Sequence, residues 1–290
     1  MISIVLPAFN EEKAIAQSLR RIQESLDSTV YKYEIIVVDD GSTDNTSEIA
    51  RALGAIVVEH PHNIGYGKSI KDGIRQAKYD SIVIMDADGT YPAHEISTLI
   101  LEFAKGFDMV VGRRTGAHFR GSPLKWQMRI LLKFLVEWSC GREIPDINSG
   151  FRIFSRKKIT SYFPQLCDTF SFTTTLTLAY MMTNRFVSYV PIEYGSRIGK
   201  THVRLWRDSL RTFQFVLQTI TYYNPLKIFV LLSLLCFFGA LISIAIGITY
   251  ELMSGFLMGA LCISIGVLGL ALGLFADLIR QTSAKNQDDM

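Results

Sequence analysis

The 290-residue sequence has few of the residues that build disulfide frameworks or metal clusters. Its four cysteines show no Cys-x-x-Cys spacing, and its five histidines show no spacing typical of metal ligands. We therefore expect neither a structural zinc site nor a disulfide-stabilised fold. The sequence also contains no nucleic-acid-binding motif, so we expect no nucleic-acid partner.

Charged residues are absent from two long segments, 228–249 and 252–276. At about 1.5 Å per residue in a helix, each segment covers the roughly 30 Å hydrocarbon core of a bilayer. A pair of buried core helices is the alternative, but a helix of this length without a polar face is typical of a membrane span. We predict an integral membrane protein with two transmembrane helices within residues 226–280.

Basic residues flank these two segments on their outer sides. The short connection at 250–251 has no Lys or Arg, whereas Lys227 precedes the first segment and Arg280 and Lys285 follow the second. Positive residues stay on the cytosolic side of a membrane. We therefore expect both termini to be cytosolic, with residues 281–290 as a cytosolic tail.

The net charge of +3 conceals an uneven distribution. Residues 1–104 are acidic and residues 105–211 are basic, and the basic part directly precedes the predicted spans. This order suits an anionic bilayer surface or a lipid phosphate better than nucleic acid. The first residues, Met1–Pro7, lack the basic segment of a signal peptide, so we expect the polar part to be cytosolic.

Strand-like and helix-like segments alternate through the first part of the chain. Apolar runs at 2–6, 34–38 and 82–86 read as strands, and helical patterns lie between them, the first opening at 10–12. Such alternation predicts an α/β fold with a parallel, doubly wound sheet. Ligands bind beyond the carboxyl ends of the strands in such sheets, which is where Asp39 and Asp86 are expected.

The segment Asp86-Ala87-Asp88-Gly89-Thr90 follows one of these strands. Two carboxylates this close are stabilised by a divalent cation that they share with phosphate oxygens. An ordinary acidic turn is one alternative. Another is a haloacid-dehalogenase-like phosphatase, in which the first Asp is the nucleophile, but that chemistry needs a further acidic pair, and the next adjacent pair is Asp288-Asp289.

Four ordered motifs in the first part of the sequence resemble family 2 of the glycosyltransferases. They are Val5 to Glu12, Val37 to Asp44, Asn63 to Gly67, and Asp86-Ala87-Asp88. The resemblance continues through Val110 to Arg114 and Asp146 to Arg152, which look like the polyisoprenyl-phosphate branch that includes dolichyl-phosphate mannose synthase. It implies a GT-A nucleotide-sugar-binding domain, which we place at residues 1–202.

The resemblance implies which residues bind the nucleotide sugar. Pro7, Ala8 and Glu11 line the base and ribose, Asp39 contacts the nucleotide, and Asp86 reaches the sugar or nucleotide. Lys68 lies at a glycine-rich helix start that favours phosphate, although a solvated surface lysine is an equal alternative. A basic loop that closes on the diphosphate corresponds to Arg197 and Lys200.

The resemblance also implies a metal site and an acceptor site. Asp86 and Asp88 correspond to the DxD motif that holds Mg²⁺ or Mn²⁺, with Thr90 as a weaker candidate ligand where many relatives have Gln. The predicted contacts to the acceptor phosphate are Arg114, Arg129, Ser149 and Arg152. We expect Asp86, Asp88 and Arg114 to be the catalytic residues.

Two segments are expected to lie at the membrane surface. Residues 123–139 form a basic, tryptophan-bearing amphipathic helix, with a surface helix packed on the sheet as the alternative. Residues 203–225 are expected to form a second interfacial helix and a linker. Glycine pairs in the second span allow close helix packing, which leaves a homo-oligomer possible.

Together these features predict a membrane-bound inverting glycosyltransferase. It would move a hexose from GDP-mannose or a UDP-hexose to dolichyl or undecaprenyl phosphate in a metal-dependent reaction. The alternatives are a family 2 enzyme with a glycan or glycolipid acceptor, and a membrane scaffold with a decayed site. The sequence does not name the sugar, the nucleotide or the lipid.

Overall fold

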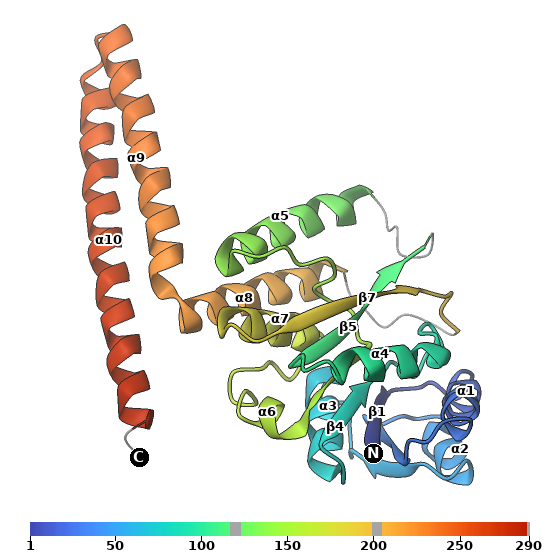
Figure 1. The fold of residues 1–290 in the computed structure, drawn as a ribbon. Coiled ribbons are helices and arrows are strands. Elements are labelled where there is room, and N and C mark those ends of the chain that lie inside the picture. The colour runs from blue at the N-terminus through green and yellow to red at the C-terminus, as the bar shows by residue number, and fades with distance from the viewer. Residues whose placement is uncertain (117–122, 199–204, 289–290) are drawn as a thin grey trace. The chain divides into compact units, whose positions relative to one another are not determined.

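The computed structural model describes residues 1–116, 123–198 and 205–288. The chain divides into two compact units, Met1–Val216 and Leu217–Met290. The division lies inside helix α8 (Leu205–Tyr223), whereas the sequence placed the end of the catalytic domain at residue 202. Figure 1 shows that the first unit combines a sheet with helices and that the second is helical.

The first unit is built on a seven-stranded sheet with the order β3-β2-β1-β4-β6-β5-β7. The strands are β1 Ile2–Ala8, β2 Tyr33–Asp39, β3 Ile56–Glu59, β4 Ser81–Ile84, β5 Met109–Thr115, β6 Arg152–Ser155 and β7 Val187–Glu193. Strands β3, β2, β1 and β4 run parallel to one another, as the alternation of elements predicts.

Strand β6 departs from the predicted parallel arrangement. It pairs antiparallel with β4 on one side and with β5 on the other. In the β4–β6 pair, Ile84 lies opposite Arg152, so the end of β4 adjoins the start of β6. The sheet is therefore mixed, and the loop that enters β6 reaches the same edge as the loop that leaves β4.

The described residues contain ten α-helices. They are α1 Ile15–Asp27, α2 Thr46–Ala52, α3 Tyr66–Gln76, α4 Ile96–Phe103, α5 Pro123–Cys140, α6 Arg156–Thr160, α7 Phe172–Met182, α8 Leu205–Tyr223, α9 Pro225–Thr249 and α10 Met253–Asp288, with a short 3₁₀ helix, η1, at Ala93–Glu95. Helix α1 starts at Ile15, later than predicted from residues 10–12.

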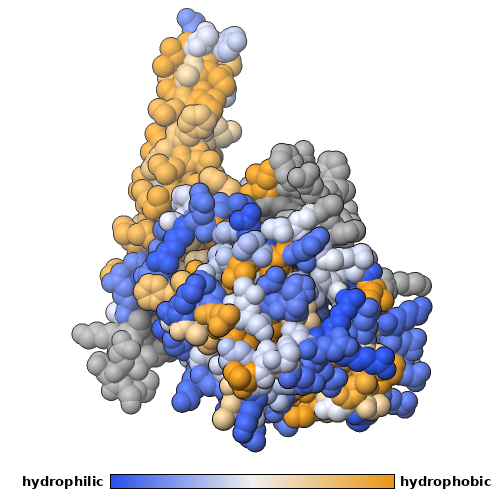
Figure 2. Space-filling view, turned by 45° about the vertical axis from the view of Figure 1, so that its right-hand side comes forward, coloured by the Kyte–Doolittle hydropathy of each residue, from blue (hydrophilic) through white to orange (hydrophobic). Residues whose placement is uncertain are grey.

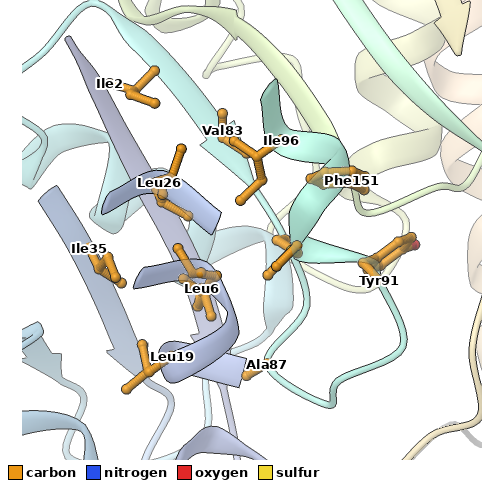
Figure 3. Close-up of a cluster of buried hydrophobic side chains, with 14 of the residues drawn as sticks. Ile2, Leu6, Leu19, Leu26, Ile35, Val83, Ala87, Tyr91, Ile96 and Phe151 are labelled. Atoms are coloured by element: carbon orange, nitrogen blue, oxygen red, sulfur yellow. The ribbon is translucent and has the colours of Figure 1, made fainter. Parts of the chain in front are cut away.

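The main hydrophobic core lies between the sheet and helices α1 and α4. Apolar residues four, three and four positions apart give α1 its buried stripe, which includes Leu19 and Leu26. Figure 3 shows Leu19 and Leu26 beside Leu6 of β1. The other face of β1 packs on α3, where a Cβ at Gly73 would lie 2.4 Å from Val5 Cγ1. Burial on two faces explains the continuous apolar sequence of β1.

The second unit contains α9 and α10, which pack along each other. Both helices are long and apolar enough to cross a membrane, over Pro225–Thr249 and Met253–Thr282. Figure 2 shows hydrophobic residues covering the hairpin, and Leu241 and Leu257 are 68% and 63% exposed. Because their apolar side chains face outward, these helices do not form a buried protein core, and they are the candidate membrane hairpin.

Glycines allow the two helices of the hairpin to approach closely. A Cβ at Gly255 would lie 2.6 Å from Gly247 Cα, and a Cβ at Gly259 would lie 2.5 Å from Ile244 Cγ1. A Cβ at Gly273 would lie 2.5 Å from Phe229 Cβ. These glycines therefore form the contact face of α10 with α9 in the same chain.

Candidate active site

Carboxylates gather where β1, β2 and β4 end. Asp39 is the last residue of β2, and Asp86 and Asp88 follow β4. Glu11 lies in the segment after β1. Because these three strands are parallel neighbours, their carboxyl ends meet at one edge of the sheet, and the four side chains belong to one site.

The segment after β1 is bent so that Glu11 faces inward. Asn10 adopts a positive φ of 55°, and its backbone N–H donates to Ser42 Oγ at 2.9 Å. The Glu11 N–H donates to Thr46 Oγ1, also at 2.9 Å. These bonds hold the segment against the loop after β2, which explains why helix α1 does not begin at Asn10.

Asp39, the last residue of β2, and Asp40, which follows it, have different partners. Asp39 is buried, and its carboxylate accepts the Ser42 N–H at 2.8 Å and the Ser47 hydroxyl. Asp40 accepts the N–H groups of Ile64 at 3.0 Å and Gly65 at 2.9 Å. Asp40 thus fixes the glycine-rich turn before α3, while Asp39 lies at the carboxyl-end edge of the sheet.

Arg197 joins two of the carboxylates. Its Nη2 lies 2.5 Å from Glu11 Oε1, and its Nε lies 3.6 Å from Asp88 Oδ2. Burial raises the pKa of Glu11 to about 7, although Arg197 opposes the shift. Burial and the charge of Asp88 raise the pKa of Asp86 to about 6. Burial in this centre therefore disfavours the charged forms of Glu11 and Asp86, although Arg197 partly offsets the effect.

Thr90 supports Asp88 from the turn that follows β4. Its hydroxyl donates to Asp88 Oδ1 at 2.6 Å, and its backbone N–H donates to the same oxygen at 3.1 Å. The turn itself passes through Gly89, whose φ is 76°. Thr90 is buried, so its contact with Asp88 orients that carboxylate and leaves Oδ2 toward Arg197.

A tyrosine and a glycine close around Asp86. The Tyr66 hydroxyl donates to Asp86 Oδ1 at 2.8 Å. A Cβ at Gly150 would lie 2.7 Å from the same oxygen. The Gly150 N–H in turn donates to Tyr91 Oη at 2.7 Å. The loop that enters β6 is therefore in direct contact with the carboxylate that follows β4.

Arg114, at the end of β5, makes a bidentate pair with Asp146. Its Nε donates to Asp146 Oδ2 and its Nη2 to Oδ1, each at 2.8 Å. Burial alone would raise the pKa of Asp146, but its hydrogen bonds with Arg114 hold it below the ordinary value. The guanidinium also lies 5.5 Å from the ring centre of Tyr194. Arg114 is thus fixed near the loop that precedes β6.

The family model described as "Glycosyl transferase family 2" matches residues 3–163 of this sequence, which contain all the strands that end at the acidic centre. The chain belongs to glycosyl transferase family 2. This membership rules out the haloacid-dehalogenase-like alternative for Asp86.

The chain spans about half the length of the curated relatives that it matches here. The undecaprenyl-phosphate 4-deoxy-4-formamido-L-arabinose transferase of Pseudomonas fluorescens (strain Pf0-1) is 33% identical over 165 residues, covering 53% of this chain and 47% of that protein. The low-salt glycan biosynthesis hexosyltransferase Agl6 of Haloferax volcanii is 32% identical over 224 residues, covering 74% of this chain and 53% of that protein.

Solved structures confirm the GT-A fold of this family 2 chain. Glucosyl-3-phosphoglycerate synthase from Mycobacterium tuberculosis, in complex with phosphoglyceric acid, aligns with a TM-score of 0.64 at 22% identity, covering 76% of this chain and 80% of that chain. A complex of the same synthase with Mn²⁺, UDP and glucosyl-3-phosphoglycerate aligns with a TM-score of 0.59 at 23% identity.

Two predicted acceptor contacts lie in the protein interior. Arg152 is fully buried and donates to the carbonyl oxygens of Ser149 and Ile147 and to Thr177 Oγ1, at 2.6, 2.9 and 2.7 Å. The Ser149 hydroxyl donates to Gly112 O at 2.6 Å. These side chains therefore order the loop before β6, and this differs from the predicted direct contact with a phosphate.

The remaining predicted residues fall into three groups. Pro7 and Ala8 lie at the end of β1, opposite Val38 and Asp39 in the strand pairing. Lys68 forms an ion pair with Asp72 within α3, at 3.0 Å. The side chain of Arg129 and the whole of Lys200 lie outside the described residues.

Sequence reasoning missed three residues of this family 2 site, which are Tyr66, Tyr91 and Asp146. Tyr66 contacts Asp86, and Tyr91 contacts Gly150. Asp146 orients Arg114. Signals existed for two of them, because Tyr66 lies inside the glycine-rich motif and Asp146 begins the motif that ends at Arg152. No local pattern marks Tyr91.

Proposed function

We propose that this family 2 member is a membrane-bound, inverting glycosyltransferase that moves a hexose from a nucleotide sugar to a polyisoprenyl phosphate. The observation that carries the proposal is the acidic centre of Glu11, Asp86 and Asp88, which meets the Gly150 loop and Arg114 at one edge of the sheet. Donor and acceptor are both anionic: the carboxylates suit a divalent cation that binds the donor diphosphate, and Arg114 suits the acceptor phosphate.

The lipid acceptor has two further supports. One relative is named an undecaprenyl-phosphate transferase, and the hairpin of α9 and α10 is long and apolar enough to cross a bilayer. A water-insoluble acceptor is met at the membrane surface where it resides. We propose that the catalytic unit and both termini are cytosolic, because Lys227 and Arg280 flank the spans.

The donor set suits a hard divalent cation, Mg²⁺ or Mn²⁺. Asp86 and Asp88 offer carboxylate oxygens, which such ions prefer, and Asp88 Oδ2 faces a cation, Arg197, in this structure. A related synthase was crystallised with Mn²⁺ and UDP. A bound metal would neutralise the charge that develops on the departing nucleoside diphosphate.

The chain's own residues then account for the remaining steps. Asp39 and Glu11 hold the nucleotide, and Arg114, fixed by Asp146, attracts the acceptor phosphate. A phosphate oxygen attacks the anomeric carbon as the bond from that carbon to the diphosphate oxygen breaks, which inverts the configuration. The acceptor is already anionic near neutral pH, so no general base is required.

The proposal is tested with the full chain purified in detergent. UDP-glucose, UDP-N-acetylglucosamine and GDP-mannose are each incubated with a short prenyl phosphate and Mn²⁺, Mg²⁺ or EDTA, and the glycolipid is quantified. We expect metal-dependent transfer from one donor, and a loss of about 100-fold or more in Asp88→Ala. Glu48→Ala, at an exposed position on α2, is the matched control and retains activity.

Two results would contradict the proposal. Absence of transfer to the prenyl phosphate from every donor removes the lipid acceptor. Equal activity of Asp88→Ala and the wild type removes the metal-binding role of the acidic centre. Transfer to an oligosaccharide in place of the prenyl phosphate would favour the glycan-acceptor alternative.

A further inference from the structure

Tyr66 is held in a fixed place by the glycines on either side of it. A Cβ at Gly65 would lie 2.6 Å from Asp168 O, and one at Gly67 would lie 2.4 Å from Cys167 O. The start of α3 therefore presses directly on the backbone of residues 167–168. The Lys68 N–H donates to Asp168 O at 2.9 Å and secures this contact. Tyr66, the first residue of α3, has little freedom to move.

The side chain of Tyr66 extends from this helix start to the acidic centre. Its hydroxyl donates to Asp86 Oδ1 at 2.8 Å, and its ring lies 6.2 Å from the ring of Phe170, centre to centre. Because a carboxylate oxygen can only accept, the Tyr66 hydroxyl is the donor in this bond.

Gly150 closes the other side of the same carboxylate. A Cβ at this position would lie 2.7 Å from Asp86 Oδ1, 2.9 Å from Tyr66 Oη and 3.0 Å from Asp86 Oδ2. Both carboxylate oxygens thus lie close to the Gly150 backbone, and Oδ1 alone also accepts the Tyr66 hydrogen bond. Among the residues that the structure describes, none donates a hydrogen bond to Oδ2 of Asp86.

The terminal torsion of an Asp side chain has a broad distribution, so rotation about it can interchange the positions of the two carboxylate oxygens. The Tyr66 hydroxyl restricts this rotation by binding one oxygen. We propose that Tyr66 is a positioning residue of the transfer reaction: it holds Oδ1 of Asp86 so that Oδ2 is presented to the donor diphosphate and its cation. This inference rests on the proposed function.

Tyr66→Phe tests the role because it removes one oxygen and keeps the ring that packs on Phe170. We expect kcat for sugar transfer to fall about 10- to 100-fold, as for loss of a hydrogen bond to a charged group. The KM for the nucleotide sugar should change less than about threefold, because Glu11 and Asp39 are untouched. Thermal unfolding should match the wild type.

Binding of Mn²⁺ gives a readout that does not depend on turnover. The full chain in detergent is titrated with Mn²⁺ in the presence of UDP and, in a parallel experiment, in the presence of GDP. The concentration of free Mn²⁺ is measured by electron paramagnetic resonance. We expect the Kd for Mn²⁺ to rise about threefold or more in Tyr66→Phe. The matched control is Tyr33→Phe, which removes a hydroxyl bonded to Asp27 at 2.6 Å, away from the site.

A double-mutant cycle shows whether Tyr66 acts through Asp86. In an Asp86→Asn background, Tyr66→Phe should weaken Mn²⁺ binding no further, whereas equal effects in the two backgrounds would overturn the proposal. Unchanged kcat and Kd in Tyr66→Phe would also overturn it, as would a fall in activity matched by a fall in thermal stability. If the wild type transfers no sugar, the proposed function fails, and the Mn²⁺ titration still decides the role of Tyr66.

Discussion

Glu11 has surroundings unlike those of an ordinary surface carboxylate. It is buried beside Asp86 and Asp88 and pairs with Arg197. Removal from solvent favours its protonated form, and the neighbouring negative charges act in the same direction. Its side chain can therefore gain or lose a proton near neutral pH, which makes the metal-free site sensitive to pH.

We predict that Glu11 lowers the stability of the metal-free protein as the pH rises. Its pKa of about 7 in the folded state exceeds the ordinary 4.5, so the folded state binds the proton more tightly than the unfolded state. The resulting stabilisation, at most about 3 kcal/mol, is complete below pH 4.5 and is lost as the pH rises through 7. Glu11→Gln should therefore melt at a higher temperature than the wild type at pH 8 in EDTA, and the difference should shrink toward pH 5.

The matched control is Glu48→Gln, the same chemical change at an exposed position on α2. Circular dichroism melting at pH 5, 6, 7 and 8 measures both variants. Parallel melting profiles for Glu11→Gln and the wild type across this range would contradict the assignment.

Residue positions that depend on local sequence could be predicted, and contacts that depend on distant pairing could not. Asp39, Asp86 and Asp88 follow apolar runs, so their place at strand ends could be derived from the pattern. Arg152 also follows a recognisable motif, but its burial depends on contacts with Ile147 and Thr177 that no pattern shows. A basic residue in a motif was therefore predicted to face a phosphate when it faces the core.

At the scale of elements, β6 explains most of the difference between the expected and the observed sheet. It has four residues and pairs with β4 and β5, although the 36 residues 116–151 separate it even from the nearer strand, β5. Alternation of strands and helices predicts parallel pairing, and a short strand inserted in the opposite direction leaves no local signal. Contact between Gly150 and Asp86 follows from this insertion and could not be predicted.

The glycines of α10 give a prediction at the same scale. Because Gly259 faces α9, Gly259→Val should separate the two helices, whereas Leu257→Val, at an outward position, should not. The reporter is Gly239→Cys, since a Cβ at position 239 lies 4.0 Å from Cys262 Sγ. Oxidation should form a disulfide within the chain, and mass spectrometry of peptides detects it.

The disulfide should form in the reporter chain and in the chain that also carries Leu257→Val. It should be lost when Gly259→Val is added. Equal cross-linking in all three proteins would show that the glycine face does not hold the hairpin together.

At the scale of the whole molecule, the chain joins a catalytic unit to a membrane hairpin. The units are Met1–Val216 and Leu217–Met290. The family model matches residues within the first unit, while the second contains the two candidate spans. The side of the membrane on which the chemistry takes place therefore depends on the orientation of the hairpin.

We predict that the connection between α9 and α10 faces the outside of the cell. In a chain whose four cysteines are replaced by serine or alanine, Glu251→Cys should react with a membrane-impermeant maleimide in intact cells. Gln281→Cys, near the far end of α10, should react only after the membrane is permeabilised. The reverse pattern would place the catalytic unit outside and would contradict the positive-inside assignment.

The antiparallel pairing of Ile84 with Arg152 has a consequence for how enzymes of this kind diversify. One strand pair connects the acidic turn after β4 to the loop before β6. The pairing depends on backbone hydrogen bonds, so the segment between α5 and β6 can change in length or charge while the register of the sheet persists. Changes of this kind can therefore accumulate between α5 and Asp146 while Gly150 keeps its place against Asp86.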